Sequence, residues 1–178
     1  MRIIAGDYKG RRLEAPLDDL IRPTSDKVKE ALFSILTLDI YDAVVCDLFA
    51  GTGNLGLEAL SRGAARCWFG DHAGESIQLI KKNTALCRAE HKSTIIHGDY
   101  KKVLSRIDEK IDLFFLDPPY HKNLLPRVFA EIAARDLLAE GGKIIAEHAR
   151  QQLLPEELAG FRKTKERSYG RVVLSIYM

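Results

Sequence analysis

Apolar residues are spaced in two ways along the chain, and their alternation predicts strands connected by helices. The three- and four-residue spacing of one helical face joins Val28, Ala31, Leu32, Ile35 and Leu36, with Thr24 or Ser25 as its N-cap. Beyond it, short apolar runs predict strands at 44–48, 67–69, 94–96, 111–116 and 143–147, with helices between them at 55–61, 75–89, around 103–104 and at 124–134. Repeated strand–helix units predict a parallel α/β sheet covered on both faces, with a ligand crevice at the carboxyl ends of its strands.

The two ends of the chain depart from this alternation. Gly6 and Gly10 within the first dozen residues predict a short hairpin, and residues 161–169 and 171–177 predict an antiparallel pair that turns at Gly170. The length of 178 residues and the absence of repeats predict a single domain over 1–178. We divide it into an N-terminal hairpin extension, 1–23, and a core, 24–178.

Composition narrows the class of protein. Charged residues at 29% and aromatic residues at 8% are ordinary for a folded globular chain, and no apolar run approaches the ~20 residues that span a bilayer. The three cysteines form no CxxC, which favours a reducing, cytoplasmic setting. The five histidines show no ligand spacing, so we expect no metal site.

Positive charge gathers at both ends, although the net charge is only +2. The first dozen residues contain four basic side chains, Arg2, Lys9, Arg11 and Arg12, and residues 161–171 contain five. Two solvated faces are one explanation. If the ends meet in space, they form a patch able to hold phosphates.

The segment 47–56 carries the first chemical signal. Gly51, Gly53 and Gly56 satisfy GxGxxG between a strand and a helix, and Asp71 follows twenty residues after Gly51, as in dinucleotide-binding proteins. Asp47 argues for another ligand, because a carboxylate at the strand end would repel a pyrophosphate but suits an ammonium group. S-adenosylmethionine (SAM) carries an ammonium group, and Asp71 could accept hydrogen bonds from the hydroxyls of its ribose. NAD and a tight turn without a ligand remain the alternatives.

The second signal is Asp117-Pro118-Pro119-Tyr120, directly after the predicted fourth strand. Two prolines end the strand and fix the backbone, so that the Asp117 carboxylate and the Pro118 carbonyl can accept both hydrogens of a nucleobase amine. Tyr120 offers a ring on which a flipped base can stack. The alternative is an ordinary end of a strand.

Two further residues are candidates near the cofactor. Asp99 could accept the adenine amine of SAM or simply cap a helix. Phe49 could contact the cofactor, although a core position is the more ordinary role.

Several blocks of the sequence resemble those of the bacterial small-subunit ribosomal RNA guanine-N2 methyltransferases, over nearly the whole chain. The blocks are 1–6 with 9–11, 22–26 leading to 30–33, 47–53, 56–64 and 117–120. Asp-Pro-Pro-Tyr alone is shared with adenine-N6 and cytosine-N4 enzymes, so the N-terminal block and Ser61-Arg62-Gly63-Ala64 narrow the resemblance to the guanine enzymes.

The resemblance implies a Rossmann-like class I fold, with a seven-stranded, mostly parallel sheet and an antiparallel last strand. It also implies that SAM is the methyl donor and that the substrate is one guanine in a loop of 16S ribosomal RNA on small subunits. By this resemblance Gly51 and Gly53 line SAM, Asp71 binds its ribose, and residues 117–120 hold the base. The family usually has Glu where Asp71 stands. The RNA-facing residues would be Arg2, Lys9, Arg11, Arg12 and Arg22.

The sequence therefore predicts a monomeric SAM-dependent enzyme that methylates the exocyclic N2 amine of a guanine in 16S rRNA. The alternatives are a nucleic-acid adenine-N6 methyltransferase, an NAD-dependent oxidoreductase, and an RNA-binding assembly factor without catalysis.

Overall fold

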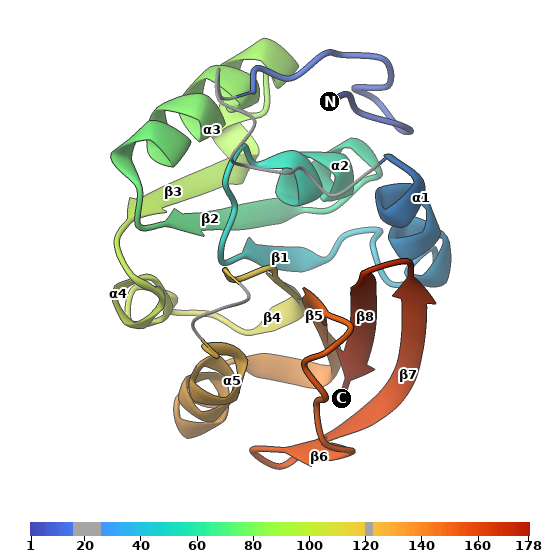
Figure 1. The fold of residues 1–178 in the computed structure, drawn as a ribbon. Helices are drawn as coiled ribbons and strands as arrows, with labels where there is room; N and C mark the ends of the chain where they lie inside the picture. The colour runs from blue at the N-terminus through green and yellow to red at the C-terminus, as the bar shows by residue number, and fades with distance from the viewer. Residues whose placement is uncertain (16–25, 120–122) are drawn as a thin grey trace.

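A computed structural model describes residues 1–15, 26–119 and 123–178, and its centre is one twisted sheet (Figure 1). The strands are β1 (Val44–Asp47), β2 (Arg66–Asp71), β3 (Ser93–His97), β4 (Ile111–Leu116), β5 (Leu138–Ala149), β6 (Glu157–Leu158), β7 (Phe161–Tyr169) and β8 (Val172–Tyr177). The helices are α1 (Asp26–Ile35), α2 (Asn54–Ser61), α3 (Gly74–Cys87), the 3-10 turn η1 (Glu90–Lys92), α4 (Tyr100–Leu104) and α5 (Leu125–Ala134).

The order of the strands is β3-β2-β1-β4-β5-β8-β7-β6. Strands β1 to β5 are parallel, and β8 runs antiparallel between β5 and β7. The predicted architecture, a mostly parallel sheet with an antiparallel last strand, is confirmed. The predicted number of seven strands is wrong by one, because the two-residue β6 adds an edge beside β7.

Helices cover both faces of the sheet because successive strand residues point to opposite sides. Val45, Leu113 and Phe115 face the core under α1, α2 and α3, whereas Cys46 and Phe114 face the core under α4 and α5. None of the described helices has both the length and the apolar character needed to cross a membrane. All three cysteines are buried and free.

The start of β5 differs from the prediction. The sequence pattern places Gly141 and Gly142 before the strand, but β5 begins at Leu138 and contains both. Pairing with β4 shifts register between Ile111 and Leu113, and this irregularity accommodates the glycines. The predicted caps Thr24 and Ser25 lie outside the described residues.

The N-terminal segment doubles back as a hairpin would, although within residues 1–15 the one bridge is the isolated pair Arg2–Arg12. The Ile3 amide donates to Arg11 O at 3.0 Å, and the Gly10 amide donates to Ile3 O at 2.9 Å. The segment lies over α2 and α3, whereas the β7–β8 hairpin lies on the other side of α1 (Figure 1). The two basic ends of the chain therefore lie on different sides of α1 (Figure 1).

Glycine at position 6 lets the N-terminal segment approach α2 closely. Its φ is +80°, and a Cβ there would lie 1.7 Å from the Ser61 carbonyl oxygen. The Ser61 hydroxyl donates to Ala5 O at 2.5 Å and accepts from the Tyr8 amide at 2.9 Å. The Ser-Arg-Gly-Ala block thus docks the N-terminal segment.

Candidate active site

Four predicted site acids follow four neighbouring strands. Asp47 and Asp71 end β1 and β2, Asp99 comes two residues after β3, and Asp117 directly follows β4. Because β3, β2, β1 and β4 are adjacent and parallel, their carboxyl ends form one edge of the sheet. The structure therefore brings these four residues to the same edge.

The loop between β1 and α2 requires its glycines for different reasons. Gly51 and Gly53 have φ of +56° and +78°, in the left-handed region that glycine tolerates. A Cβ on Gly51 would meet nothing within 4 Å, so the backbone there is open to a ligand. A Cβ on Gly56 would lie 2.3 Å from Phe69 Cε1 and 2.7 Å from Cys67 Sγ, so glycine is needed for α2 to pack on β2.

Asp47 lies buried beneath this loop. Its carboxylate accepts a hydrogen bond from the Gly56 amide at 2.9 Å. Burial raises the pKa of Asp47 to about 7, and the negative charge of Asp71 adds to the increase. A buried acid at this point favours a cationic ligand group over a pyrophosphate.

Asp71 is bound to the glycine loop. Its Oδ2 accepts from the Gly51 amide at 2.9 Å, and its Oδ1 accepts from the Ala73 amide at 2.9 Å. Both oxygens retain lone pairs, so a ribose contact stays a prediction.

Asp99 caps a helix and Phe49 lies in the core, which are the alternatives to a cofactor contact that the sequence left open for them. Asp99 caps α4, because its Oδ1 accepts from the Lys102 amide at 2.9 Å. Phe49 is half-buried and packs against the core under α4 and α5. A contact of either residue with a cofactor is untested.

Asp117 is partly exposed at this edge, followed by the buried Pro118 and the half-buried Pro119. Burial raises the pKa of the Asp117 carboxyl well above its usual range, and the charges of Glu147 and Asp47 raise it further. Tyr120 lies outside the described residues.

Glu147 is an acid of this edge that the sequence interpretation missed. Leu116 pairs with Ala146 in the parallel β4–β5 register, so Asp117 and Glu147 continue their strands side by side. Glu147 is buried. An acid directly after the apolar run Ile144-Ile145-Ala146 was the signal that could have revealed it.

Comparisons with known proteins identify the family. The sequence family described as Conserved hypothetical protein 95 matches residues 1–178. The chain is 37% identical over 180 residues to YlbH of Bacillus subtilis (strain 168), named provisionally as an rRNA methyltransferase, covering 99% of this chain and 98% of that protein. It is 33% identical over 177 residues to Ribosomal RNA small subunit methyltransferase D of Escherichia coli (strain K12), covering 99% and 89%. The chain belongs to this family of ribosomal RNA methyltransferases.

Solved structures agree with that membership. The Escherichia coli protein yhhF, described provisionally as a methyltransferase, has a TM-score of 0.89 and 32% identity, with 99% of this chain and 96% of that chain covered. The hypothetical protein TTHA0928 of Thermus thermophilus has a TM-score of 0.84 and 27% identity, covering 99% and 98%. Because the family match begins at residue 1, the N-terminal segment is part of the shared fold.

A buried lysine ties that N-terminal segment to the glycine loop. Lys29 of α1 is fully buried, and its ammonium donates to Arg2 O at 2.6 Å and to Asn54 Oδ1 at 2.7 Å. The same ammonium lies 3.1 Å from Glu58 Oε2. Burial lowers the pKa of Lys29, and Glu58 opposes that change.

Asn83 of α3 makes a second link, also missed in the sequence. Its side-chain oxygen accepts from the Glu14 amide at 2.7 Å, and its amide nitrogen donates to Glu14 O at 3.0 Å. The same nitrogen donates to Thr52 O at 2.9 Å, within the glycine loop. Buried polar groups need such partners, so this fully buried amide fixes the loop against the N-terminal segment.

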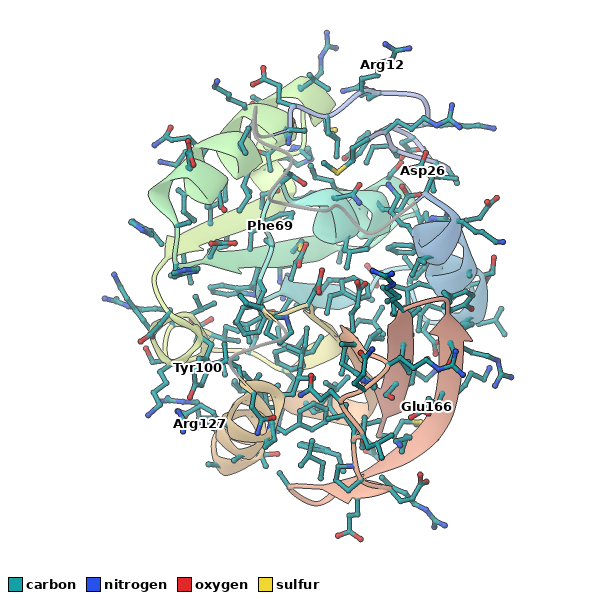
Figure 2. All side chains as sticks on the ribbon, in the orientation of Figure 1. Arg12, Asp26, Phe69, Tyr100, Arg127 and Glu166 are labelled. Atoms are coloured by element: carbon teal, nitrogen blue, oxygen red, sulfur yellow. The ribbon has the colours of Figure 1, made fainter. Side chains whose placement is uncertain are left out.

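The predicted RNA-facing cations differ in whether their charged groups already have partners within the protein. Arg2 lies 3.4 Å from Asp26 in an ion pair, and Arg11 donates to Leu86 O while lying 5.4 Å over the Tyr8 ring. Lys9 and Arg12 are exposed, and Arg12 points away from the fold (Figure 2). Arg22 lies outside the described residues.

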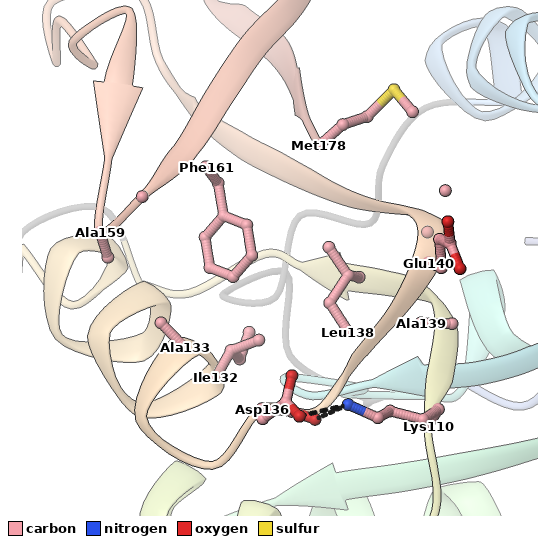
Figure 3. A pocket seen from close by; sticks show the side chains of 13 residues that line it. Lys110, Ile132, Ala133, Asp136, Leu138, Ala139, Glu140, Ala159, Phe161 and Met178 are labelled. Atoms are coloured by element: carbon pink, nitrogen blue, oxygen red, sulfur yellow. Dashed lines mark hydrogen bonds and ion pairs between the residues drawn. The ribbon is translucent and has the colours of Figure 1, made fainter.

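A cavity of about 550 Å³ lies at the opposite edge of the sheet (Figure 3). Its lining includes Ile132, Leu138, Phe161 and Met178, with a Lys110–Asp136 ion pair of 2.7 Å at its side. None of the predicted site residues lines this cavity. Across the described ranges, no group of three or more His, Cys, Asp or Glu side chains is placed to hold a metal ion.

Proposed function

We propose that this chain transfers a methyl group from SAM to the exocyclic N2 amine of one guanine in 16S rRNA of the small ribosomal subunit. The observation that carries the proposal is the position of Asp117. It follows β4 at the same edge as the glycine loop, remains partly exposed, and has a raised pKa. The Escherichia coli relative named for the small subunit supports the choice of RNA.

The residues at this edge fit SAM. When bound, SAM supplies a methyl group on a positively charged sulfonium and carries an ammonium group. Asp47, Asp117 and Glu147 are acids at this edge whose ionised forms the cationic groups of SAM would favour, and the open backbone at Gly51 gives a ligand access. Gly51 and Gly53 would line the cofactor, Asp71 would accept from its ribose, and Asp99 would accept from its adenine.

Asp117 and Pro118 would act on the target amine. The lone pair of a nucleobase amine is delocalised into the ring, so the nitrogen is a poor nucleophile. Two acceptors, the Asp117 carboxylate and the Pro118 carbonyl, would bind its two hydrogens and favour the tetrahedral nitrogen that attacks. The raised pKa of Asp117 suits it to take the proton that the nitrogen loses. Catalysis then consists of positioning and electrostatics, and Tyr120 would stack on the base.

The N-terminal extension, 1–23, would face the RNA, with the core 24–178 holding the cofactor. Lys9 and Arg12 are its exposed cations, so they are the first candidates for phosphate contacts. We propose that the chain acts as a monomer and that the small subunit or its assembly intermediate presents the target base.

The test is transfer of labelled methyl from SAM to under-methylated small subunits, followed by nucleoside analysis. We expect N2-methylguanine from the wild-type chain and at least a ~100-fold lower rate from Asp117→Ala, because a group acting on the reacting atom is lost. Asp136→Ala is the matched control, since Asp136 is exposed at the opposite edge. N6-methyladenine as the product, binding of NADH but not SAM, or an active and folded Asp117→Ala would each overturn the proposal.

A further inference from the structure

The basic residues between 161 and 171 have no role in the site described above. The order of the strands nevertheless places some of them at the edge of the sheet where Asp117 lies. Strand β7 runs parallel to β5, because both pair antiparallel with β8. The carboxyl end of β7 therefore lies at the same edge as Asp117. Arg167 belongs to that end, and Arg171 follows in the turn to β8.

Strand register aligns Arg167 with the catalytic acids. Glu147 pairs with Leu174 of β8, and Leu174 pairs with Arg167. Directly paired residues share a face of the sheet, so Glu147 and Arg167 point to the same side, with one strand between them. Asp117 stands one strand further, and three strand spacings of ~4.8 Å place Arg167 about 15 Å from it.

Arg150 extends the same rim at the end of β5. Its backbone amide donates to Arg171 O at 3.0 Å, which holds the two residues together. Arg150, Arg167 and Arg171 are all exposed. Within the described residues none of the three has a carboxylate partner, and Arg167 donates only to the carbonyl of Glu166.

The acid closest in sequence is already neutralised. Glu166 accepts from Ser175 Oγ at 3.0 Å and lies 2.9 Å from the Lys163 ammonium. Glu166 pairs with Ser175 and so points to the face opposite Arg167. The three arginines therefore leave an uncompensated positive rim beside a partly exposed catalytic acid.

We propose that Arg150, Arg167 and Arg171 form a phosphate-binding rim that holds the RNA backbone flanking the target base. The proposal rests on the proposed function, because RNA is the substrate whose base would reach Asp117. The RNA strand on either side of that base must cross the neighbouring parts of the same edge, and guanidinium groups bind phosphates there without reading sequence. This rim is separate from Lys9 and Arg12, because the N-terminal segment that contains them lies on the other side of α1 from the β7–β8 hairpin (Figure 1).

The experiment measures methyl transfer to under-methylated small subunits by the full chain carrying Arg150→Ala, Arg167→Ala and Arg171→Ala together. We expect KM for the subunit to rise about tenfold or more, with kcat and the SAM dissociation constant nearly unchanged. Between 50 and 200 mM KCl, the slope of log affinity against log salt should fall by about 2, because each lost phosphate contact removes roughly 0.7–0.9. Arg162→Ala is the control, since Arg162 is an exposed arginine at the other end of β7.

Each outcome has a distinct meaning. A higher KM and a lower salt slope in the triple variant, absent in Arg162→Ala, support the rim. A triple variant with wild-type KM and salt slope overturns it, even while wild-type transfer to guanine upholds the proposed function. An increase in KM without a change in slope also overturns it, because the contact is then not with phosphate. If the triple variant does not fold, Arg167→Glu alone provides the same comparison. No transfer by the wild-type chain rejects the proposed function itself.

Discussion

The Lys29 ammonium lies 3.1 Å from the Glu58 carboxylate, and both side chains are fully buried between α1 and α2. Glu58 also accepts from the backbone amides of Ile4 and Ala5 and from the Arg62 guanidinium. This one carboxylate therefore fixes the N-terminal segment to the helix that follows the glycine loop.

We predict that Glu58→Leu destabilises the fold more than Lys29→Met does. Removing Glu58 leaves a buried ammonium without its counter-charge and two amides without acceptors, at a cost of about 3–5 kcal/mol. Removing Lys29 leaves Glu58 with Arg62 and both amides. Urea unfolding of the two variants at one pH measures the order, and the reverse order would contradict this account.

The buried Asp47 predicts a pH dependence of stability. Its pKa is about 7 in the fold against an ordinary value of 3.8, so the folded state binds the proton more tightly. The resulting stabilisation is complete below about pH 4 and is lost as the pH rises through 7, by at most about 4 kcal/mol. In Asp47→Asn the unfolding free energy should change less over this range, since an amide oxygen can still accept from Gly56. A pH dependence in Asp47→Asn equal to that of the wild-type chain would contradict this account.

Asn83 offers a test of the link between the N-terminal segment and the glycine loop. Asn83→Asp removes the donor to Thr52 O, so the loop should lose its fixed position and SAM should bind about tenfold more weakly. Lys82→Ala is the matched control, because it breaks only the 3.3 Å surface ion pair with the Glu14 carboxylate. Titration calorimetry with SAM compares the two. Equal dissociation constants in two folded variants would show that the loop does not need Asn83.

Packing at Gly56 predicts an asymmetry between two glycine substitutions. Gly56→Ala forces a methyl group into Phe69 and Cys67, with an expected loss of at least ~1–3 kcal/mol in unfolding free energy. Gly74→Ala, at the start of α3, meets nothing within 4 Å and should be neutral or slightly stabilising. Thermal unfolding of the two variants gives the comparison, and a neutral Gly56→Ala would refute the close approach of α2 to β2.

Glu147 predicts a shift in the pH profile of methyl transfer. In the proposed mechanism Asp117 is ionised when it accepts from the amine, so the rate should fall as the pH drops through its raised pKa. Glu147 contributes to that increase, and Glu147→Gln should therefore move the acid limb to lower pH. The measurement is the rate at saturating SAM and RNA across pH 5–9. A lower rate with an unmoved limb would assign Glu147 a purely structural role.

Local patterns determined much of the architecture. The five parallel strands were predicted within a few residues, except at the start of β5, because apolar runs between glycines and prolines mark short buried strands. The glycine loop and Asp117-Pro118-Pro119 could be recognised as candidates from the sequence because their residues are nearly consecutive. Placing Asp47, Asp71, Asp99 and Asp117 at one edge followed from the rule for parallel strands.

Only the tertiary structure decided which polar residues act together. Lys29, Glu58 and Asn83 are residue types common on exposed helix surfaces, and each is buried here where it contacts the N-terminal segment. Glu147 comes beside Asp117 through the pairing of β4 with β5, and Arg167 comes to the same edge of the sheet through pairing with β8. The net charge of +2 does not show that Arg167 lies at this edge, because a net charge says nothing of where each charge lies in space. The sequence by itself determined the chain's local elements and motifs, whereas contacts between remote segments determined the surroundings of each charge, since burial and pairing are properties of the packed chain.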